Sequence, residues 1–229
     1  MAWEKRGPQL LIGIPHTGEV TMEWALAFKQ LIVPMPFLMT FQRGQPLDLA
    51  RNAIVEEALR NEVEWLFFLD SDVILEPDAL QRLLSHNLPI VSALYYRRHP
   101  SIGPAGPIMQ PVPAAWRYAP EEVRKPGALF TPIMDPPAQL FEADVIGMGA
   151  CLIHTSVFKR LKPPWFKWTA GWGKYGLADP WEEMSEDFYF CIRAKKELGL
   201  KIMVDGSVRA RHCYTGVVDE YGRISFHRV

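Results

Sequence analysis

Apolar runs and amphipathic stretches alternate along the first part of the chain. Short apolar runs bounded by Pro, Gly or polar residues predict buried strands, and apolar residues that recur every three or four positions predict helices. The expected strands cover residues 10–14, 37–41, 65–69 and 88–95, and the expected helices cover residues 19–32, 48–61 and 77–85. This alternation is typical of an α/β fold with a doubly wound sheet flanked by helices.

The pattern is less regular in the second part of the chain. Residues 96–137 are rich in Pro, Gly and aromatic residues, so we expect an irregular connection across the sheet, in which residues 115–118 are a candidate strand. Beyond it, residues 146–154 are expected to form a Gly-punctuated bend followed by a strand. The pattern then predicts helices at 155–161 and 188–198, strands at 200–204 and 208–212 joined by a turn at 205–206, and a polar tail from 213 with a hairpin at 220–222. Without an internal repeat, one domain is expected.

Capping residues mark the ends of two predicted helices. Asp48 is a candidate N-cap for the helix at 48–61, and Ser185 for the later helix, which Gly199 ends. The acidic residues that follow Ser185 suit a helix N-terminus and therefore have a purely structural explanation as well.

Two other stretches point to function. Gly147 and Gly149 lie in the bend before the strand of this stretch, where Gly indicates close approach of the backbone to a ligand or another strand. The loop at 162–181 contains Trp165, Trp168, Trp172 and Trp181. Its length and aromatic residues suit a lid, a platform for sugar or base rings, or a hydrophobic flap over the core.

Composition narrows the class of protein. The 229 residues are 48% hydrophobic with a formal net charge of −1, so neither nucleic acid nor an anionic membrane is expected as the main partner. Three cysteines form no tight pattern, which favours a reducing, cytoplasmic location. Cys151 and His154 have the spacing of metal ligands, but they lie in an apolar run and are interpreted as core. No signal peptide or membrane-spanning run is expected.

The most informative stretch runs from Trp65 to Val73. Five apolar residues lead into Asp70 and Asp72, two positions apart. If the chain stays extended, both carboxylates point to the same side, at the carboxyl edge of the sheet where open α/β folds bind ligands. Such carboxylates repel each other unless a cation lies between them, and oxygen ligands suit Mg²⁺ or Mn²⁺ bound with a substrate's phosphates. The same residues also fit a polar turn before the next helix.

Arg51 lies in the first turns of the helix at 48–61. An Arg at this position can reach an anion held at the helix N-terminus. Taken alone, Arg51 is better explained as a solvated Arg that pairs with Asp48 or Glu56.

Together, these motifs resemble the GT-A glycosyltransferases, especially the family 2-like group. The matching residues, in order, are Leu11-Ile12-Gly13-Ile14-Pro15, Ala50-Arg51-Asn52, Phe68-Leu69-Asp70-Ser71-Asp72-Val73, Gly147-Met148-Gly149-Ala150, Ser185-Glu186-Asp187 with Arg193 and Gly199, and His212. The resemblance implies a GT-A fold with a doubly wound mixed sheet flanked by helices. It also implies one catalytic domain over 1–229, with a nucleotide-binding half at about 8–100, an acceptor and metal half at about 101–212, and a tail at 213–229.

The resemblance implies a metal site built on the family's DxD motif. Asp72 would bind Mn²⁺ or Mg²⁺ directly, and Asp70 would contact the donor's ribose or the metal through water. His212 would be the second protein ligand of the metal.

The donor and acceptor roles also follow from the resemblance. Residues that would hold the nucleoside or face the donor's phosphates are Pro15, Thr17, Gln42 and Arg51, while Met148, Gly149 and Glu186 would line the sugar and acceptor cleft. Asp187 would be the general base that takes the proton of an acceptor hydroxyl, with inversion at the sugar carbon. Retaining members of the fold share the same metal site.

The sequence departs from the family at the end of the second strand. Many members carry an Asp there, whereas this chain has Thr40-Phe41-Gln42-Arg43. UDP and GDP are the expected donor nucleotides, and dTDP stays open. The acceptor, a saccharide or a glycosylated molecule, is not identified, and neither is the oligomeric state.

Two other functions fit parts of the sequence. The stretch Phe67-Phe68-Leu69-Asp70-Ser71-Asp72-Val73 also resembles the nucleophile strand of haloacid-dehalogenase-type phosphatases, in which Asp70 would be phosphorylated. Two strand–helix units precede it here, whereas in that family this strand comes first. A non-catalytic nucleotide-sugar-binding module would keep Asp72 and His212 but would not need Asp187.

Overall fold

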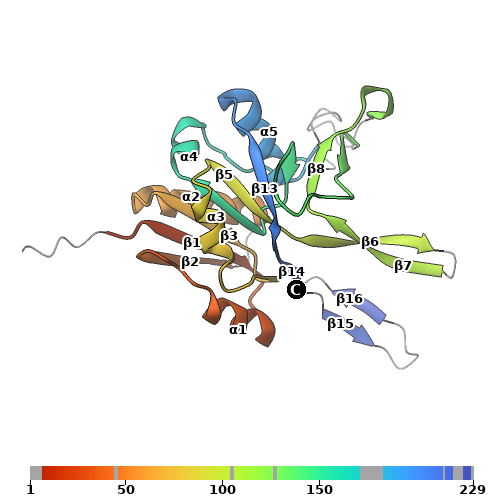
Figure 1. Ribbon diagram of the computed structural model, residues 1–229, viewed down its shortest axis with the longest axis horizontal. Helices are drawn as coiled ribbons and strands as arrows, with labels where there is room; N and C mark the ends of the chain where they lie inside the picture. The colour runs from red at the N-terminus through yellow and green to blue at the C-terminus, as the bar shows by residue number, and fades with distance from the viewer. Residues whose placement is uncertain are drawn as a thin grey trace, which may run out of the picture.

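The largest element of the structure is a seven-stranded sheet in the order β10-β13-β5-β12-β3-β1-β2 (Figure 1). The structure is a computed structural model that describes residues 7–43, 46–103, 106–125, 128–170, 183–213, 215–218 and 224–227. The strands of the sheet are β1 (Leu10–His16), β2 (Phe37–Arg43), β3 (Trp65–Leu69), β5 (Ile90–Leu94), β10 (Leu140–Ala143), β12 (Ala150–His154) and β13 (Ile202–Arg209).

The sheet is mixed, as predicted. β1 pairs in parallel with β2 and β3, and β13 pairs in parallel with β5. β12 lies antiparallel between β3 and β5, and β10 lies antiparallel to β13 at one edge. The carboxyl ends of β1, β2 and β3 therefore meet at one end of the sheet, where ligands bind in open α/β folds.

Within the described residues, five helices pack around the sheet: α1 (Met22–Gln30), α2 (Leu47–Arg60), α3 (Ala79–Ser85), α4 (Ser156–Arg160) and α5 (Glu186–Leu198), with a 3-10 turn at Glu121–Val123. All five were expected from the sequence, with ends that differ by up to three residues. α2 packs across β1, β2 and β3, and α3 across β5, β12 and β13. Gly13 on β1 is required there, because a Cβ atom would overlap Ile54 Cγ2 of α2.

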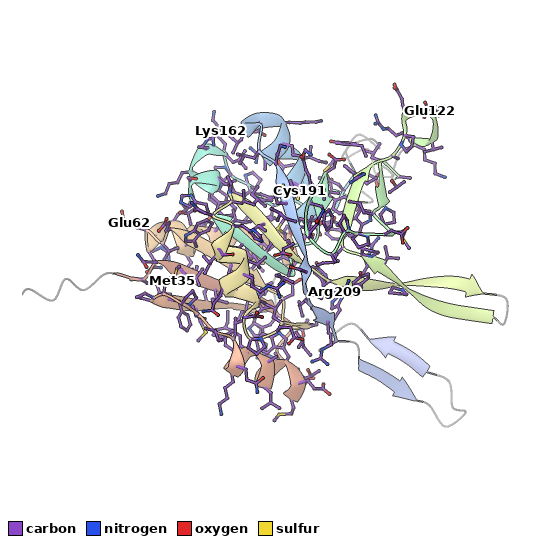
Figure 2. The ribbon with its side chains drawn as sticks, in the orientation of Figure 1. Met35, Glu62, Glu122, Lys162, Cys191 and Arg209 are labelled. Carbon is purple, nitrogen blue, oxygen red and sulfur yellow. The ribbon has the colours of Figure 1, made fainter. Side chains whose placement is uncertain are left out.

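The apolar residues of the sheet and helices form one core. Figure 2 shows Cys191 of α5 inside the densely packed body, whereas Glu122 lies at its periphery. Cys151 and Cys191 are buried free thiols and Cys213 is a half-buried one, so the core interpretation of Cys151 is confirmed. Among the described helices, none combines the length and the apolar character that crossing a bilayer requires.

The prediction of an irregular connection at residues 96–137 is wrong, although the candidate strand at 115–118 is confirmed as β8. This segment contains the hairpin β6 (Tyr96–Gly103) and β7 (Gly106–Pro113), then β8 (Ala115–Tyr118) and β9 (Phe130–Pro132). β8 lies between β9 and β11 (Val145–Ile146) in a separate antiparallel sheet. The Pro residues were misleading because both strands of a two-stranded hairpin are edge strands, which tolerate Pro.

Two smaller pairs of strands complete the fold. β14 (Arg211–His212) pairs with β4 (Val73–Ile74), directly after the Asp70–Asp72 turn. β15 (Thr215–Val218) pairs with β16 (Ile224–His227), and this hairpin and β6–β7 both project from the body on the right of Figure 1. The hairpin predicted for the tail is therefore present, although its turn at 220–222 lies outside the described residues.

The predicted turn at Asp205-Gly206 lies inside a strand. β13 runs from Ile202 to Arg209, with a register shift against β5 between Asp205 and Arg209. Asp205 Oδ1 accepts hydrogen bonds from the amide and the hydroxyl of Ser207, and Asp205 Oδ2 lies 2.8 Å from His86 Nε2 of α3. Pairing and these bonds override the local turn signal, so the two predicted strands merge into one.

The helix caps match the prediction for α5 only in part. Gly199 at the C-cap has the left-handed φ of 66°, as expected of a terminating Gly. Ser185 occupies the N-cap position, but its hydroxyl donates to the Asp187 carboxylate instead of accepting from a helix amide. In α2 the N-cap position belongs to Pro46, so the prediction that Asp48 caps this helix is wrong.

Candidate active site

A cleft of about 530 Å³ lies where the carboxyl edge of the central sheet faces the β11-β8-β9 sheet and the start of α5. The residues predicted from the sequence that line it are Arg51, Asp70, Met148, Glu186, Asp187 and His212. Six predicted residues from distant parts of the sequence therefore share one cavity. Of the other predicted residues, Pro15, Thr17, Gln42, Asp72 and Gly149 do not belong to its lining.

Arg51 connects two of these carboxylates. Its side chain is buried, and Nη2 donates to both carboxylate oxygens of Asp70 at 3.0 and 3.2 Å, while Nε donates to Glu186 Oε1 at 3.2 Å. Burial alone would lower the pKa of Arg51, but Asp70 and Glu186 raise it above its usual value, so the guanidinium stays charged. The expected surface pairing with Asp48 or Glu56 is wrong, because this face of α2 points into the protein.

Asp70 and Asp72 diverge after β3. The chain turns at this point: the Val73 amide donates to the Asp70 carbonyl at 3.1 Å, and Asp70 does not continue the strand. Asp70 consequently reaches Arg51 while Asp72 reaches His212, so the expectation of two carboxylates on the same side of an extended strand is wrong. Burial raises the pKa of Asp70, the charge of Asp72 adds to this, and Arg51 opposes it.

Asp72 and His212 form a buried pair. His212 Nε2 lies 3.0 Å from Asp72 Oδ2, and His212 Nδ1 lies 3.3 Å from the Tyr96 carbonyl oxygen. Because a carbonyl only accepts, Nδ1 carries the proton in this contact, and Nε2 is the ring nitrogen that faces the carboxylate. Two acceptor atoms at this distance would repel each other, and either a proton on Nε2 or a metal cation bound to both removes that repulsion.

Within the described residues, no group of three or more His, Cys, Asp or Glu side chains is placed to hold a metal ion. The physical reason is the pairing just described, since Arg51 takes Asp70 away from the Asp72–His212 pair. Carboxylate oxygen and imidazole nitrogen nevertheless suit Mn²⁺, and carboxylate oxygen suits Mg²⁺.

Asp187 lies in the first turn of α5, half-buried against the cleft. Burial, together with the charge of Glu186, raises the pKa of Asp187 to about 7. Asp187 Oδ1 accepts hydrogen bonds from the Ser185 hydroxyl and, at 2.8 Å, from the Phe188 amide. Within the described part of the chain Oδ2 has no hydrogen-bond partner, so this oxygen is available to accept a proton.

Tyr95, which the sequence analysis did not single out, organises the middle of the cleft. The Gly149 amide donates to Tyr95 Oη at 3.2 Å, and the Tyr95 ring meets the His212 ring edge-on, with 5.6 Å between the ring centroids. A Cβ atom on Gly147 would overlap Tyr95 Oη, and one on Gly149 would lie 3.1 Å from it. The close approach that the two Gly residues indicated is therefore to a side chain, and Gly149 supports the cleft without lining it.

Aromatic residues form the far wall of the cleft. Phe188 of α5 meets both Trp116 of β8 and Phe130 of β9 edge-on, and the Arg97 guanidinium lies 4.8 Å from the Trp116 ring centroid. Trp168 lines the mouth of the cleft and is 43% exposed. Trp168 belongs to the Trp-rich loop that the sequence analysis singled out, whereas Trp172 and Trp181 of the same loop lie outside the described residues.

The start of α2 fixes the segment that carries Trp168. The Trp168 amide donates to Asp48 Oδ2 at 3.1 Å. Asn52 Oδ1 accepts from the amides of Trp165 and Phe166 at 2.9 and 3.2 Å. Arg51 therefore binds the carboxylates of Asp70 and Glu186, whereas Asn52 anchors the loop segment that contains Trp165 and Phe166.

The predicted nucleoside residues lie at the ends of β1 and β2. Pro15 and Gln42 are register partners there, and Thr17 follows in the bend after β1. β2 extends to Arg43 rather than ending at Phe41, so Gln42 is a strand residue and not part of a loop. These three residues share one end of the sheet, beside the cleft rather than in its lining.

Solved structures share this architecture. The crystal structure of A197 from STIV matches with a TM-score of 0.56 and 16% identity, over 96% of this chain and 95% of that one. The structure of GalNAc-T7 with UDP, GalNAc and Mn²⁺ matches with a TM-score of 0.50 and 11% identity, over 91% of this chain and 44% of that one. The chain has a GT-A-like fold.

Sequence comparison agrees with the GT-A-like fold over part of the chain. The Anp1 family model matches residues 38–107, which include Asp70 and Asp72. No curated protein matches the chain significantly by sequence. The predicted GT-A fold is confirmed, whereas the roles assigned to individual residues stay predictions.

Proposed function

We propose that this protein is a metal-dependent glycosyltransferase that moves a sugar from a nucleotide-diphosphate donor to an acceptor hydroxyl. The observation that carries the proposal is one cleft, in a GT-A-like fold, that Asp70, Asp187 and His212 line together. The neighbour GalNAc-T7, whose structure contains UDP, GalNAc and Mn²⁺, supports the same class of reaction. The Anp1 match, to a mannosyltransferase-like domain, supports it too.

The Asp72–His212 pair fits a divalent metal. Neighbouring ligands of an octahedral ion with bonds of about 2.1 Å lie about 3.0 Å apart. The Asp72 Oδ2 to His212 Nε2 distance is 3.0 Å, so the pair matches two adjacent positions of such a shell. The carbonyl that holds His212 Nδ1 orients the imidazole for this role. With two protein ligands, the remaining positions would go to water and donor phosphate oxygens.

The donor would extend from this pair toward the ends of β1 and β2. Pro15, Thr17 and Gln42 would contact the nucleoside there, as the resemblance implies. Arg51 is already bound to Asp70 and Glu186, so its role is to hold Asp70 in place beside the donor. One of its nitrogens, Nη1, has no hydrogen-bond partner within the described structure and is left for a ligand oxygen or a water.

The chemical step would use Asp187 as the base. Asp187 Oδ2 takes the proton of the acceptor hydroxyl while the acceptor oxygen forms a bond to the anomeric carbon, and the bond from that carbon to the diphosphate oxygen breaks. The nucleoside diphosphate leaves with the bonding electron pair, and attack from the opposite face inverts the carbon. A bound divalent metal would neutralise the leaving diphosphate.

The experiment that tests the proposal measures nucleoside diphosphate release from UDP- and GDP-sugars, with and without Mn²⁺ and with saccharide acceptors. Release that needs both metal and acceptor supports a transferase. Metal-dependent donor binding without release at any acceptor would instead indicate the non-catalytic binding module.

The phosphatase alternative is not supported. The GT-A-like fold places β3 third among the strands of the chain, between β1 and the antiparallel β12. Both carboxylate oxygens of Asp70 accept hydrogen bonds from Arg51, which leaves a poor nucleophile. Phosphate release from a small phosphomonoester that Asp70→Asn abolishes would revive this alternative.

A further inference from the structure

The two edges of the seven-stranded sheet differ in their protection. β10 has four residues, and Lys195 forms ion pairs with Glu142 of this strand and with Asp144 just after it. Short length and charge are the usual protection of an edge strand against pairing with another chain. β2 has seven residues and contains no Pro, Lys, Asp or Glu, and its single charged residue is Arg43 at its end.

β2 is also regular, and its outer side is open. It pairs with β1 at all seven positions without a register shift. Within the described residues, no strand pairs with its other side. The Pro36 carbonyl accepts a hydrogen bond from the Gln9 amide at 2.8 Å and so faces β1. Because successive residues direct their backbone groups alternately to either side, those of Phe37, Met39 and Phe41 face the open edge.

The side chains of the same three residues form an exposed apolar row. Phe37, Met39 and Phe41 are 42%, 45% and 54% exposed. Their face is opposite to α2, because Thr40 is the register partner of Gly13, against which Ile54 of α2 packs. Unpaired backbone groups and an apolar row thus occupy the same edge, which is a template for another strand.

We infer that β2 joins two copies of this chain through antiparallel pairing about a twofold axis at Thr40. In this register every residue of β2, from Phe37 to Arg43, lies opposite a residue of the partner subunit's β2. It places Met39 opposite the partner subunit's Phe41, which suits a sulfur–aromatic contact, and Phe37 opposite the partner subunit's Arg43, which suits a cation–π contact.

Self-complementarity favours a second copy over a foreign strand. Under the twofold axis the residues that face the open edge, Phe37, Met39, Phe41 and Arg43, meet only one another, so their backbone groups satisfy each other in hydrogen-bonded pairs. A twofold contact is closed and does not propagate into a fibre. The joined sheet would have fourteen strands, within the range of about 8–15 found in large α/β enzymes. The inference does not depend on the proposed function.

The first test is the mass of the full chain in solution, measured by sedimentation equilibrium from low to high micromolar concentration. The inference predicts that the mass rises with concentration from 26.2 kDa to twice that value. A mass of 26.2 kDa at every concentration overturns it.

The second test locates the contact. Met39→Pro removes an amide that faces the open edge without removing a bond to β1, so the variant is expected to stay at the monomer mass with an unchanged circular dichroism spectrum. Met39→Leu is the matched control and is expected to dimerise. If Met39→Pro does not fold, Phe41→Lys decides, because a charge at the edge opposes pairing. A dimer that survives in Met39→Pro or Phe41→Lys overturns the inference.

Discussion

Neighbouring carboxylates in the cleft have different environments. Arg51 forms ion pairs with Asp70 and Glu186, whereas Asp187 accepts hydrogen bonds from Ser185 and Phe188. Burial and the charge of Glu186 raise the pKa of Asp187 to about 7, where a carboxylate is a useful base near neutral pH. Asp187 therefore leads to two predictions, one that separates catalysis from binding and one on the pH dependence of stability.

Replacing the base should remove turnover and leave donor binding intact. Asp187→Asn is expected to lower kcat by about 10²–10⁴-fold, with an unchanged Kd for the nucleoside diphosphate and Mn²⁺. For the wild type, kcat/KM should fall as the pH drops below about 7, because the base is then protonated. Asp78→Asn, at an exposed position before α3, is the control and should match the wild type. Equal loss of binding and turnover in Asp187→Asn would contradict the assignment.

The same pKa predicts how stability depends on pH. The folded pKa of Asp187 is about 7 against an ordinary value of 3.8, so between these values the folded state binds more protons than the unfolded state. This contribution to stability is fully present below the unfolded pKa and is lost as the pH rises through about 7. Asp187→Asn should therefore gain stability relative to the wild type on going from about pH 5 to about pH 8 in urea unfolding. A difference that is independent of pH would show that the site does not raise the pKa of Asp187.

At the scale of elements, local signals were sufficient for the helices and insufficient for several strands. The start and the Gly199 cap of α5 were visible in the sequence because capping and helical periodicity act over a few residues. The Asp205-Gly206 signal failed because α3 and the neighbouring strands hold these residues in β13. The β6–β7 hairpin was not predicted because Pro residues interrupt the alternation of apolar and polar residues that marks a strand. Strand pairing depends on distant residues, which a local pattern does not contain.

Arg51 should be the residue of α2 that matters most for stability. Arg51→Met leaves Asp70 and Glu186 buried without their counter-ion, which should cost about 3–5 kcal/mol in the free energy of unfolding. The matched control is Arg60→Met on the same helix, whose exposed pair with Glu57 should contribute less than about 1 kcal/mol. Urea denaturation of the two variants measures both values, and equal losses would mean that the buried network is not formed.

Gly147 should tolerate a side chain only when Tyr95 is shortened. A Cβ atom at this position would overlap Tyr95 Oη, so Gly147→Ala is expected to lower the free energy of unfolding by about 1–3 kcal/mol. In the double variant Gly147→Ala with Tyr95→Phe, part of this loss should be recovered, because the overlapping oxygen is gone. A double-mutant cycle measures the coupling, and additive effects would show that the two residues are not in contact.

At the scale of the whole molecule, the sequence predicted which residues line the cleft better than it predicted the contacts between them. Asp70, Asp187 and His212 do share one cleft. The pairing of Asp70 with Arg51 and the part played by Tyr95 were not predictable, because they depend on a turn after β3 and on contacts between residues far apart in the sequence. The order of the motifs along the sequence indicated the fold, because in a GT-A-like sheet the strands that carry these motifs lie side by side.

The most direct test of the central claim is the thermal stability of the protein with UDP, GDP, dTDP, CDP or ADP, each with and without Mn²⁺. A ligand that binds the folded state raises Tm by mass action. The proposed site predicts that one nucleoside diphosphate raises Tm only when Mn²⁺ is present, and that Asp72→Asn and His212→Asn each lose this increase. No increase with any nucleotide, or the same increase without metal, would contradict a metal-dependent donor site.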